Sequence, residues 1–204
     1  MIKTPTGSKT SRAITQEQYT KLIDHTIRSG NLKFGCMLLF MGSRGLRISD
    51  VTRLKINDVF FDSNQGKVRD SMRILIKKQK KKLHIKLRTK SSKYFINQLE
   101  SYFHLISDRD HSELLFQGNF KNEVPHSAIK KYLNDYKKKP DVLINQLSPH
   151  SLRKQWARSL WNKGQGVPVE IIQRMLGHSN INTTHIYMDI ISSDIDSAYD
   201  AILF

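Results

Sequence analysis

The segment from Ser148 to Tyr187 limits what this chain can fold into more than any other stretch. Ser148 is a good helix N-cap and Pro149 suits the first helical position, so a helix is expected to begin there. Apolar residues at helical spacing predict a second helix that ends at Gly177, because glycine favours the left-handed turn after a helix. These residues are Val169, Ile172, Met175 and Leu176. The segment is therefore expected to hold two helices joined by a connection.

Four chemically active side chains fall within this segment. His150 and Arg153 are three residues apart, on one face of the first helical turn. His178 lies just past the end of the second predicted helix, nine residues before Tyr187. A fixed cation, two imidazoles and a phenol are suitable groups for attacking a phosphodiester.

These residues stand in a pattern that resembles the catalytic core of the tyrosine recombinases, the phage integrase family. The resemblance extends from Ala13 to Tyr187, and four motifs occur in the family's order. The motifs are Gly45-Leu46-Arg47-Ile48-Ser49-Asp50, His150-Ser-Leu-Arg153, Leu176-Gly177-His178 and Thr183-Thr184-His185-Ile186-Tyr187.

The resemblance implies a site-specific DNA recombinase that cleaves and rejoins strands through a 3′-phosphotyrosyl intermediate. In this family Tyr187 would be the nucleophile, and Arg47 and Arg153 would clamp the scissile phosphate. Guanidinium groups suit that role because they stay charged and bind phosphate oxygens through paired hydrogen bonds. Asp50, one helical turn beyond Arg47, would orient the active-site cations without touching the phosphate.

The family pattern also implies three groups that handle protons and charge. His150 would assist proton transfer at the tyrosine, and His178 would hydrogen-bond a phosphoryl oxygen. A lysine in a β-hairpin turn would protonate the departing 5′-oxygen. Matching the lysine-rich turn of this chain to the family's hairpin favours Lys78, with Lys77 as the main rival.

Composition points to a polyanionic partner. The 204 residues include 34 Lys plus Arg against 18 Asp plus Glu, a net charge of +16, so double-stranded DNA is the leading candidate. On charge alone, a ribosome-associated or merely basic protein is an equal alternative. The residues expected to contact the DNA backbone are Lys77, Lys80, Lys81, Lys130 and Lys137.

The remaining patterns predict an α+β fold, mainly helical with a small antiparallel sheet. Helices are expected over 15–27, 31–41, 48–54, 95–106 and 126–139, and strands over 72–76 and 83–87. No apolar run approaches membrane-spanning length, so a cytoplasmic, nucleoid-associated protein is expected.

Three parts are expected along the chain: a flexible basic arm over 1–12, a catalytic domain over 13–188 and a tail helix over 189–204. The tail has an apolar stripe that, in this family, would pass to a neighbouring protomer; the alternative is that this helix folds back on its own domain. Most members also carry an N-terminal helical domain. This sequence is therefore either an isolated catalytic domain or a naturally short member similar to the invertases of fimbrial switches, and Met1 favours the second.

The family implies a protein that is monomeric in free solution and forms a homo-tetramer on paired DNA sites, with DNA-bending accessory proteins as further partners. No metal or other cofactor is expected, because the phosphotyrosine conserves the energy of the broken bond. Two alternatives remain open. One is a type IB topoisomerase-like enzyme that relaxes DNA, and the other is a non-catalytic DNA-binding regulator with the same fold.

Overall fold

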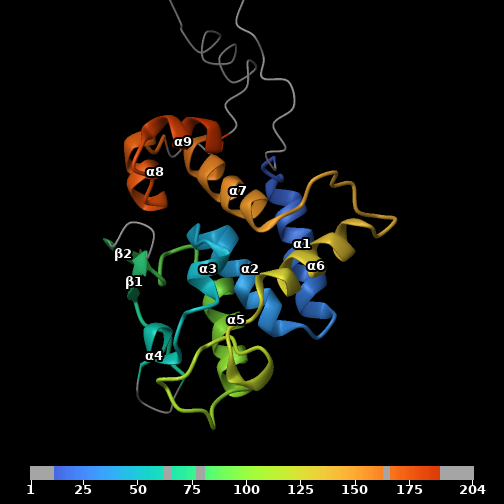
Figure 1. Ribbon diagram of the computed structural model, residues 1–204, viewed down its shortest axis with the longest axis vertical. Helices are drawn as coiled ribbons and strands as arrows, with labels where there is room; N and C mark the ends of the chain where they lie inside the picture. The colour runs from blue at the N-terminus through green and yellow to red at the C-terminus, as the bar shows by residue number, and fades with distance from the viewer. Residues whose placement is uncertain (1–11, 62–65, 77–80, 163–165, 189–204) are drawn as a thin grey trace, which may run out of the picture.

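Local sequence signals set several helix boundaries in the computed structural model, which describes residues 12–61, 66–76, 81–162 and 166–188. Helices dominate the described residues, and a two-stranded antiparallel hairpin lies at one side (Figure 1). The helices are α1 (Gln16–Arg28), α2 (Leu32–Arg44), α3 (Ile48–Val51), α4 (Ile56–Val59), α5 (Lys93–His104), the 3-10 turn η2 (Asn119–Lys121), α6 (His126–Lys137), α7 (Pro149–Asn162), α8 (Val169–Leu176) and α9 (Ile181–Met188). The strands are β1 (Ser71–Ile76) and β2 (Lys81–Lys86). The predicted fold class is confirmed.

Helix starts follow the capping residues seen in the sequence. At the start of α1, the hydroxyl of Thr15 accepts from the backbone N–H of Gln18 at 3.1 Å, and the Gln18 side chain accepts from Thr15 N at 2.9 Å. At the start of α7, Ser148 Oγ accepts from Ser151 N at 3.3 Å, which leaves Pro149 as the first helical residue. Both predicted helix starts are confirmed.

The larger of two hydrophobic cores surrounds α2, which contacts α1, α5 and α7. The predicted apolar run of this helix is buried over most of its length, and Cys36 and Phe40 are fully enclosed. Phe40 meets Phe95 of α5 edge to face, with ring centroids 5.1 Å apart. Because α2 has neighbours on several sides, it is apolar around most of its circumference.

The hairpin is attached to the end of α2. β1 and β2 pair antiparallel, with Met72 opposite Ile85, and both side chains face the core. Arg44, the last residue of α2, donates from Nη2 to Leu87 O at 2.6 Å just beyond β2. Its guanidinium also lies 4.1 Å from the centroid of the Phe95 ring. These contacts position the hairpin and the turn after α2 on the same part of the molecule.

A second, smaller core lies among α7, α8 and α9, and α7 joins it to the first (Figure 1). Leu152 of α7 packs into the larger core, whereas Trp156 and Ala157, one turn later, pack into the smaller one. Of the predicted apolar face of α8, Ile172 and Leu176 are buried. The inclusion of Met175 in that face was wrong: its side chain is 39% exposed because α8 is covered along a narrower strip.

The sequence patterns did not predict α4 or α9. α9 has a weak apolar pattern, since Asn182, Thr183 and His185 are exposed and only Thr184 and Met188 have buried side chains among those described. Packing against α7 and α8 therefore determines this helix more than its own sequence does. Within the described residues, no helix is long and apolar enough to cross a bilayer.

We expect Gly45→Ala to lower the free energy of unfolding by about 1–3 kcal/mol more than Gly30→Ala. Both glycines have left-handed backbones, with φ of 63° and 78°, so both variants share the conformational penalty. Only at position 45 would a Cβ overlap the indole of Trp156, whereas at position 30 it would meet open space. Urea unfolding of the two variants measures the difference, and equal losses would contradict the packing assigned to Trp156.

Candidate active site

The guanidinium of Arg153 lies between the two cores and defines the centre of the site. The side chain is only 2% exposed. Nη1 donates to the carbonyl of Gly45 at the end of α2, and Nη2 donates to the carbonyl of Leu176 at the end of α8, at 2.5 Å. Burial, reinforced by the charge of Arg47, lowers the pKa of Arg153 to about 10, so it remains cationic at neutral pH. One buried cation thus holds together the turn after α2 and the turn after α8.

Arg47 brings a second cation to the same place. It immediately precedes α3, and its backbone N–H donates to Asp50 Oδ2 at 3.3 Å, so the carboxylate fixes the backbone that carries this side chain. Arg47 Nη1 is buried without a hydrogen-bond partner among the described residues. Burial raises the pKa of Asp50 despite the nearby arginines. A buried guanidinium nitrogen next to another guanidinium is a favourable place for an anion.

Tyr187 of α9 faces His150 of α7. The distance from Tyr187 Oη to His150 Nδ1 is 3.3 Å, within hydrogen-bonding reach. Burial raises the pKa of Tyr187, although Arg153 and Arg47 oppose the increase, so the phenol is protonated at neutral pH. Desolvation, followed by the surrounding cations, lowers the pKa of His150, so its imidazole is neutral there. A neutral imidazole beside a protonated phenol can accept its proton.

His178 lies beside the tyrosine ring. It follows Gly177, whose left-handed φ of 63° ends α8, and its backbone N–H donates to Gln173 O at 3.0 Å. Its ring is 5.2 Å from that of Tyr187, and its Nδ1 is 3.0 Å from Thr184 Oγ1. Burial, followed by Arg153 and Arg47, lowers the pKa of His178 to about 4. The imidazole is therefore neutral in the free protein.

The structure thus brings Arg47, His150, Arg153, His178 and Tyr187 into one cluster, with Asp50 behind Arg47. They come from the turn after α2, the first turn of α7, the end of α8, and α9. Within the described part of the chain, no group of three or more His, Cys, Asp or Glu is arranged to hold a metal ion.

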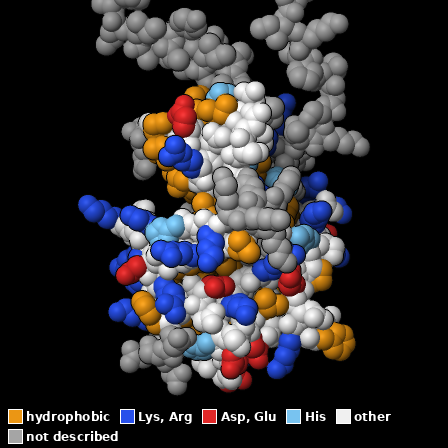
Figure 2. Space-filling view, turned by 60° about the vertical axis from the view of Figure 1, so that its left-hand side comes forward, with side chains coloured by type: hydrophobic (Ala, Val, Ile, Leu, Met, Phe, Trp, Pro, Cys, Tyr) orange, Lys and Arg blue, Asp and Glu red, His pale blue; other side chains and the backbone are white. Residues whose placement is uncertain are grey.

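Only some of the lysines predicted to act at the site or to contact DNA fall within the described residues. Lys77, Lys78 and Lys80 lie outside the described residues, and Lys81 is the first residue of β2. Lys130 is exposed on α6 and contributes to the lowered pKa of His150, so its charge acts on the site. Lys137 is half-buried near the end of α6. Lys, Arg and His side chains gather in a band across the middle of the face in Figure 2.

Two further residues, for which the sequence motifs indicated no role, contact the cluster. Lys154 is 4% exposed, and its Nζ lies 5.7 Å from the centroid of the Tyr187 ring. Thr184 is fully buried against His178. Their positions gave usable signals, because Lys154 is four residues after His150 and Thr184 is three before Tyr187, spacings that place helical residues on one face.

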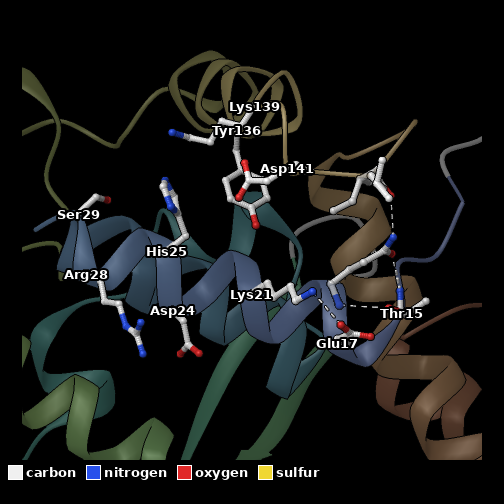
Figure 3. Close-up of a pocket in the computed structure, with 14 residues that line it drawn as sticks. Thr15, Glu17, Lys21, Asp24, His25, Arg28, Ser29, Tyr136, Lys139 and Asp141 are labelled. Atoms are coloured by element: carbon white, nitrogen blue, oxygen red, sulfur yellow. Dashed lines mark hydrogen bonds and ion pairs between the residues drawn. The ribbon is translucent and has the colours of Figure 1, made fainter.

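A hollow of about 810 Å³ lies elsewhere, lined by α1, α6 and the chain after α6 (Figure 3). None of the catalytic candidates lines it. Its charges are balanced, and Lys21 pairs with Glu17 at 2.8 Å across one turn of α1. The acidic lining residues are Glu17, Asp24 and Asp141, and the basic ones are Lys21, Arg28 and Lys139. This lining gives the hollow little net attraction for a phosphodiester, in contrast to the arginine-rich cluster.

We expect Arg47→Ala to raise the pKa of His178 from about 4 toward its ordinary value, because removing a nearby positive charge makes protonation easier. Lys137→Ala, which removes a cation that does not act on this imidazole, should leave the pKa unchanged. Histidine titration by NMR measures both variants. A His178 pKa that does not move in Arg47→Ala would mean that the two side chains are farther apart in solution.

A family model, curated proteins and solved structures that are similar to this chain all point to the same family. The model of the phage integrase family matches residues 12–193. Tyrosine recombinase XerA of Pyrococcus horikoshii is 28% identical over 192 residues, which are 93% of this chain and 60% of the relative. A probable integrase/recombinase of Methanocaldococcus jannaschii is 26% identical over 183 residues, 86% of this chain and 52% of the relative. The chain therefore spans between about half and two thirds of the length of these curated relatives.

Solved structures show the same fold. The crystal structure of XerA recombinase has a TM-score of 0.75 at 22% identity, covering 98% of this chain and 68% of that one. XerH site-specific recombinase bound to palindromic difH substrate has a TM-score of 0.69 at 17% identity, covering 95% of this chain and 54% of that one. Because the family model matches most of the sequence, and the fold and the four motifs agree with it, this chain belongs to the phage integrase family.

Proposed function

We propose that this protein is a site-specific DNA recombinase that cleaves and rejoins strands through a 3′-phosphotyrosyl intermediate. The observation that carries the proposal is the 3.3 Å approach of Tyr187 Oη to His150 Nδ1, next to the paired cations Arg47 and Arg153. The net charge of +16 supports DNA as the substrate. Solved structures of the same fold are described as bound to DNA, among them lambda integrase and the Tn1549 transposon integrase.

In the proposed cleavage step, His150 accepts the phenolic proton as Tyr187 Oη attacks the scissile phosphorus. An O–P bond to tyrosine forms and the bond from phosphorus to the 5′-oxygen breaks, so the strand end is held as a phosphotyrosyl ester. Arg47 and Arg153 bind the nonbridging oxygens, on which negative charge increases in the transition state. His178 adds a hydrogen bond to one of those oxygens. Asp50 keeps Arg47 in place through its backbone.

The departing 5′-oxygen needs a proton, and Lys78 is the proposed donor, with Lys77 as the alternative. Both lysines stand in the sequence between β1 and β2, and the chain just beyond β2 is attached to the end of α2 by the hydrogen bond from Arg44 to Leu87. The other lysines expected to touch DNA are Lys77, Lys80, Lys81, Lys130 and Lys137. Lys130 has the most direct support, from its effect on His150.

Strand exchange requires more than one protomer, and we extend the proposal to a homo-tetramer on paired sites that dissociates to monomers in free solution. Lambda integrase is described as a tetramer bound to a Holliday junction. The tail over 189–204, which directly follows the nucleophile's helix, would pass between protomers and so link assembly to the position of Tyr187. Accessory DNA-bending proteins and a cytoplasmic, nucleoid-associated location belong to the same proposal.

The recombinase is expected to belong to a mobile element, so the proposal is tested with the full chain on DNA that carries two copies of the repeats flanking that element. Tyr187→Phe should abolish covalent protein–DNA adducts and leave DNA binding nearly unchanged, because only the nucleophilic oxygen is removed. Tyr94→Phe is the control: this tyrosine is partly exposed on α5 and hydrogen-bonded to Asp24. Adducts are scored by denaturing electrophoresis and rearranged DNA by sequencing across the junctions.

Each alternative gives a different outcome in that assay. Adducts with relaxed but unrearranged DNA would indicate the topoisomerase-like enzyme. Binding without adducts in the wild-type protein would indicate the non-catalytic regulator. Persistence of adducts in Tyr187→Phe would mean that another residue is the nucleophile. Deleting residues 190–204 should spare binding to a single half-site, remove synapsis and alter cleavage, and recombination of two sites at the wild-type rate would refute tail exchange.

We expect a substrate with sulfur in place of the scissile 5′-oxygen to restore cleavage in Lys78→Ala, since a thiolate leaves without needing a proton. The same substrate should give little recovery in Arg153→Ala, because the clamp acts on the phosphate and not on the leaving group. Cleavage rates with the two substrates measure the recovery. Recovery confined to Lys77→Ala would transfer the role of proton donor to Lys77.

A further inference from the structure

One buried hydroxyl contacts the active-site cluster without belonging to the chemistry described above. Thr184 is fully buried in α9, and its Oγ1 lies 3.0 Å from His178 Nδ1. The neighbouring residues Thr183 and His185 are exposed, so the burial of Thr184 is specific to its face of the helix. That face is shared with Tyr187, three residues later.

The contact matters because of the protonation state of the imidazole. Burial and the two arginines keep His178 neutral at physiological pH, and a neutral imidazole has a single N–H. If that proton is on Nδ1, the other nitrogen presents a lone pair, which would repel a phosphoryl oxygen. If it is on Nε2, that nitrogen can donate to such an oxygen, and Nδ1 becomes an acceptor. The partner of Nδ1 thus bears on whether His178 can help hold a phosphate.

We propose that Thr184 is a positioning residue that donates from its hydroxyl to His178 Nδ1 and so holds the ring in the orientation and the Nε2–H tautomer needed to donate to a phosphoryl oxygen. The proposal rests on the proposed function, which assigns that hydrogen bond to His178. A threonine hydroxyl suits the position because it supplies one directed donor and no charge, whereas a further cation would add to the repulsion around Arg47 and Arg153.

The placement of Thr184 has a structural consequence. α9 carries both the nucleophile and the group that aligns His178, while His178 itself belongs to the end of α8. Docking of α9 therefore supplies Tyr187 and an aligned His178 together. A displacement of α9 would remove the nucleophile Tyr187 from the site and would also leave His178 without the residue that aligns it. A protomer with a displaced α9 would therefore lack two features needed for cleavage.

The first test is spectroscopic and needs no DNA. In the ¹⁵N-labelled free protein, histidine side-chain spectra should show His178 as the Nε2–H tautomer, with Nδ1 in the shift range of a nitrogen that accepts a hydrogen bond. Thr184→Val, which keeps the shape of the side chain and removes the hydroxyl, should shift Nδ1 to the range of an acceptor without a partner. Thr184→Ser should restore the wild-type shift. A wild-type His178 protonated on Nδ1 would overturn the proposal.

The second test measures single-turnover cleavage. Thr184→Val should reduce the rate about tenfold, Thr184→Ser should recover most of it, and Thr183→Val is the matched control on the exposed face of the same helix. Thermal unfolding of each variant reports any loss of stability. In a double-mutant cycle, Thr184→Val should cost almost nothing once His178→Ala is present, because Thr184 acts through that imidazole.

The outcomes separate this inference from the proposed function. If Thr184→Val is as damaging with His178→Ala as without it, Thr184 only stabilises α9, and the positioning role is refuted. If His178→Ala alone cleaves at the wild-type rate, the phosphate contact assigned to His178 fails. The spectra still report in that case whether Thr184 sets the tautomer.

Discussion

The structure depends on the placement of one buried cation, the guanidinium of Arg153. Removing a charge from water is costly unless polar partners replace the lost hydration. Arg153 obtains them from the carbonyls of Gly45 and Leu176, which end α2 and α8 and so belong to the two separate cores. The chain reversals that carry Arg47 and His178 directly follow those two residues. One ionic group therefore fixes the spacing between the parts of the site.

The accumulated positive charge determines the protonation of the other groups. Burial together with Arg47 and Arg153 lowers the pKa of both His150 and His178, and burial raises that of Tyr187. The free site is thus a protonated phenol between two neutral imidazoles, with one guanidinium nitrogen lacking a partner among the described residues. In the proposed function, a phosphodiester supplies the anion that this arrangement lacks.

Features governed by neighbouring residues could be predicted from the sequence. The capping box at Thr15, the start of α7 at Ser148 and Pro149, and the stop at Gly177 are interactions within one helical turn, and all three appear as expected. Both hairpin strands were predicted, the second of them from its alternating pattern. Met175 was misassigned, since how wide a strip of α8 is covered depends on its neighbours. α9 was missed because most of its residues are polar and its stability comes from packing.

The sequence by itself determined the fold class, the starts of α1 and α7, the end of α8 and, through four ordered motifs, the family and the residues of the cluster. It could not determine the contacts among them. The 3.3 Å approach of Tyr187 to His150, the burial of Lys154 beside the tyrosine ring, and the bond between Thr184 and His178 join different helices. Local propensity and periodicity act over a few residues, whereas these contacts arise only when α7 places its two halves in different cores and α9 packs against it.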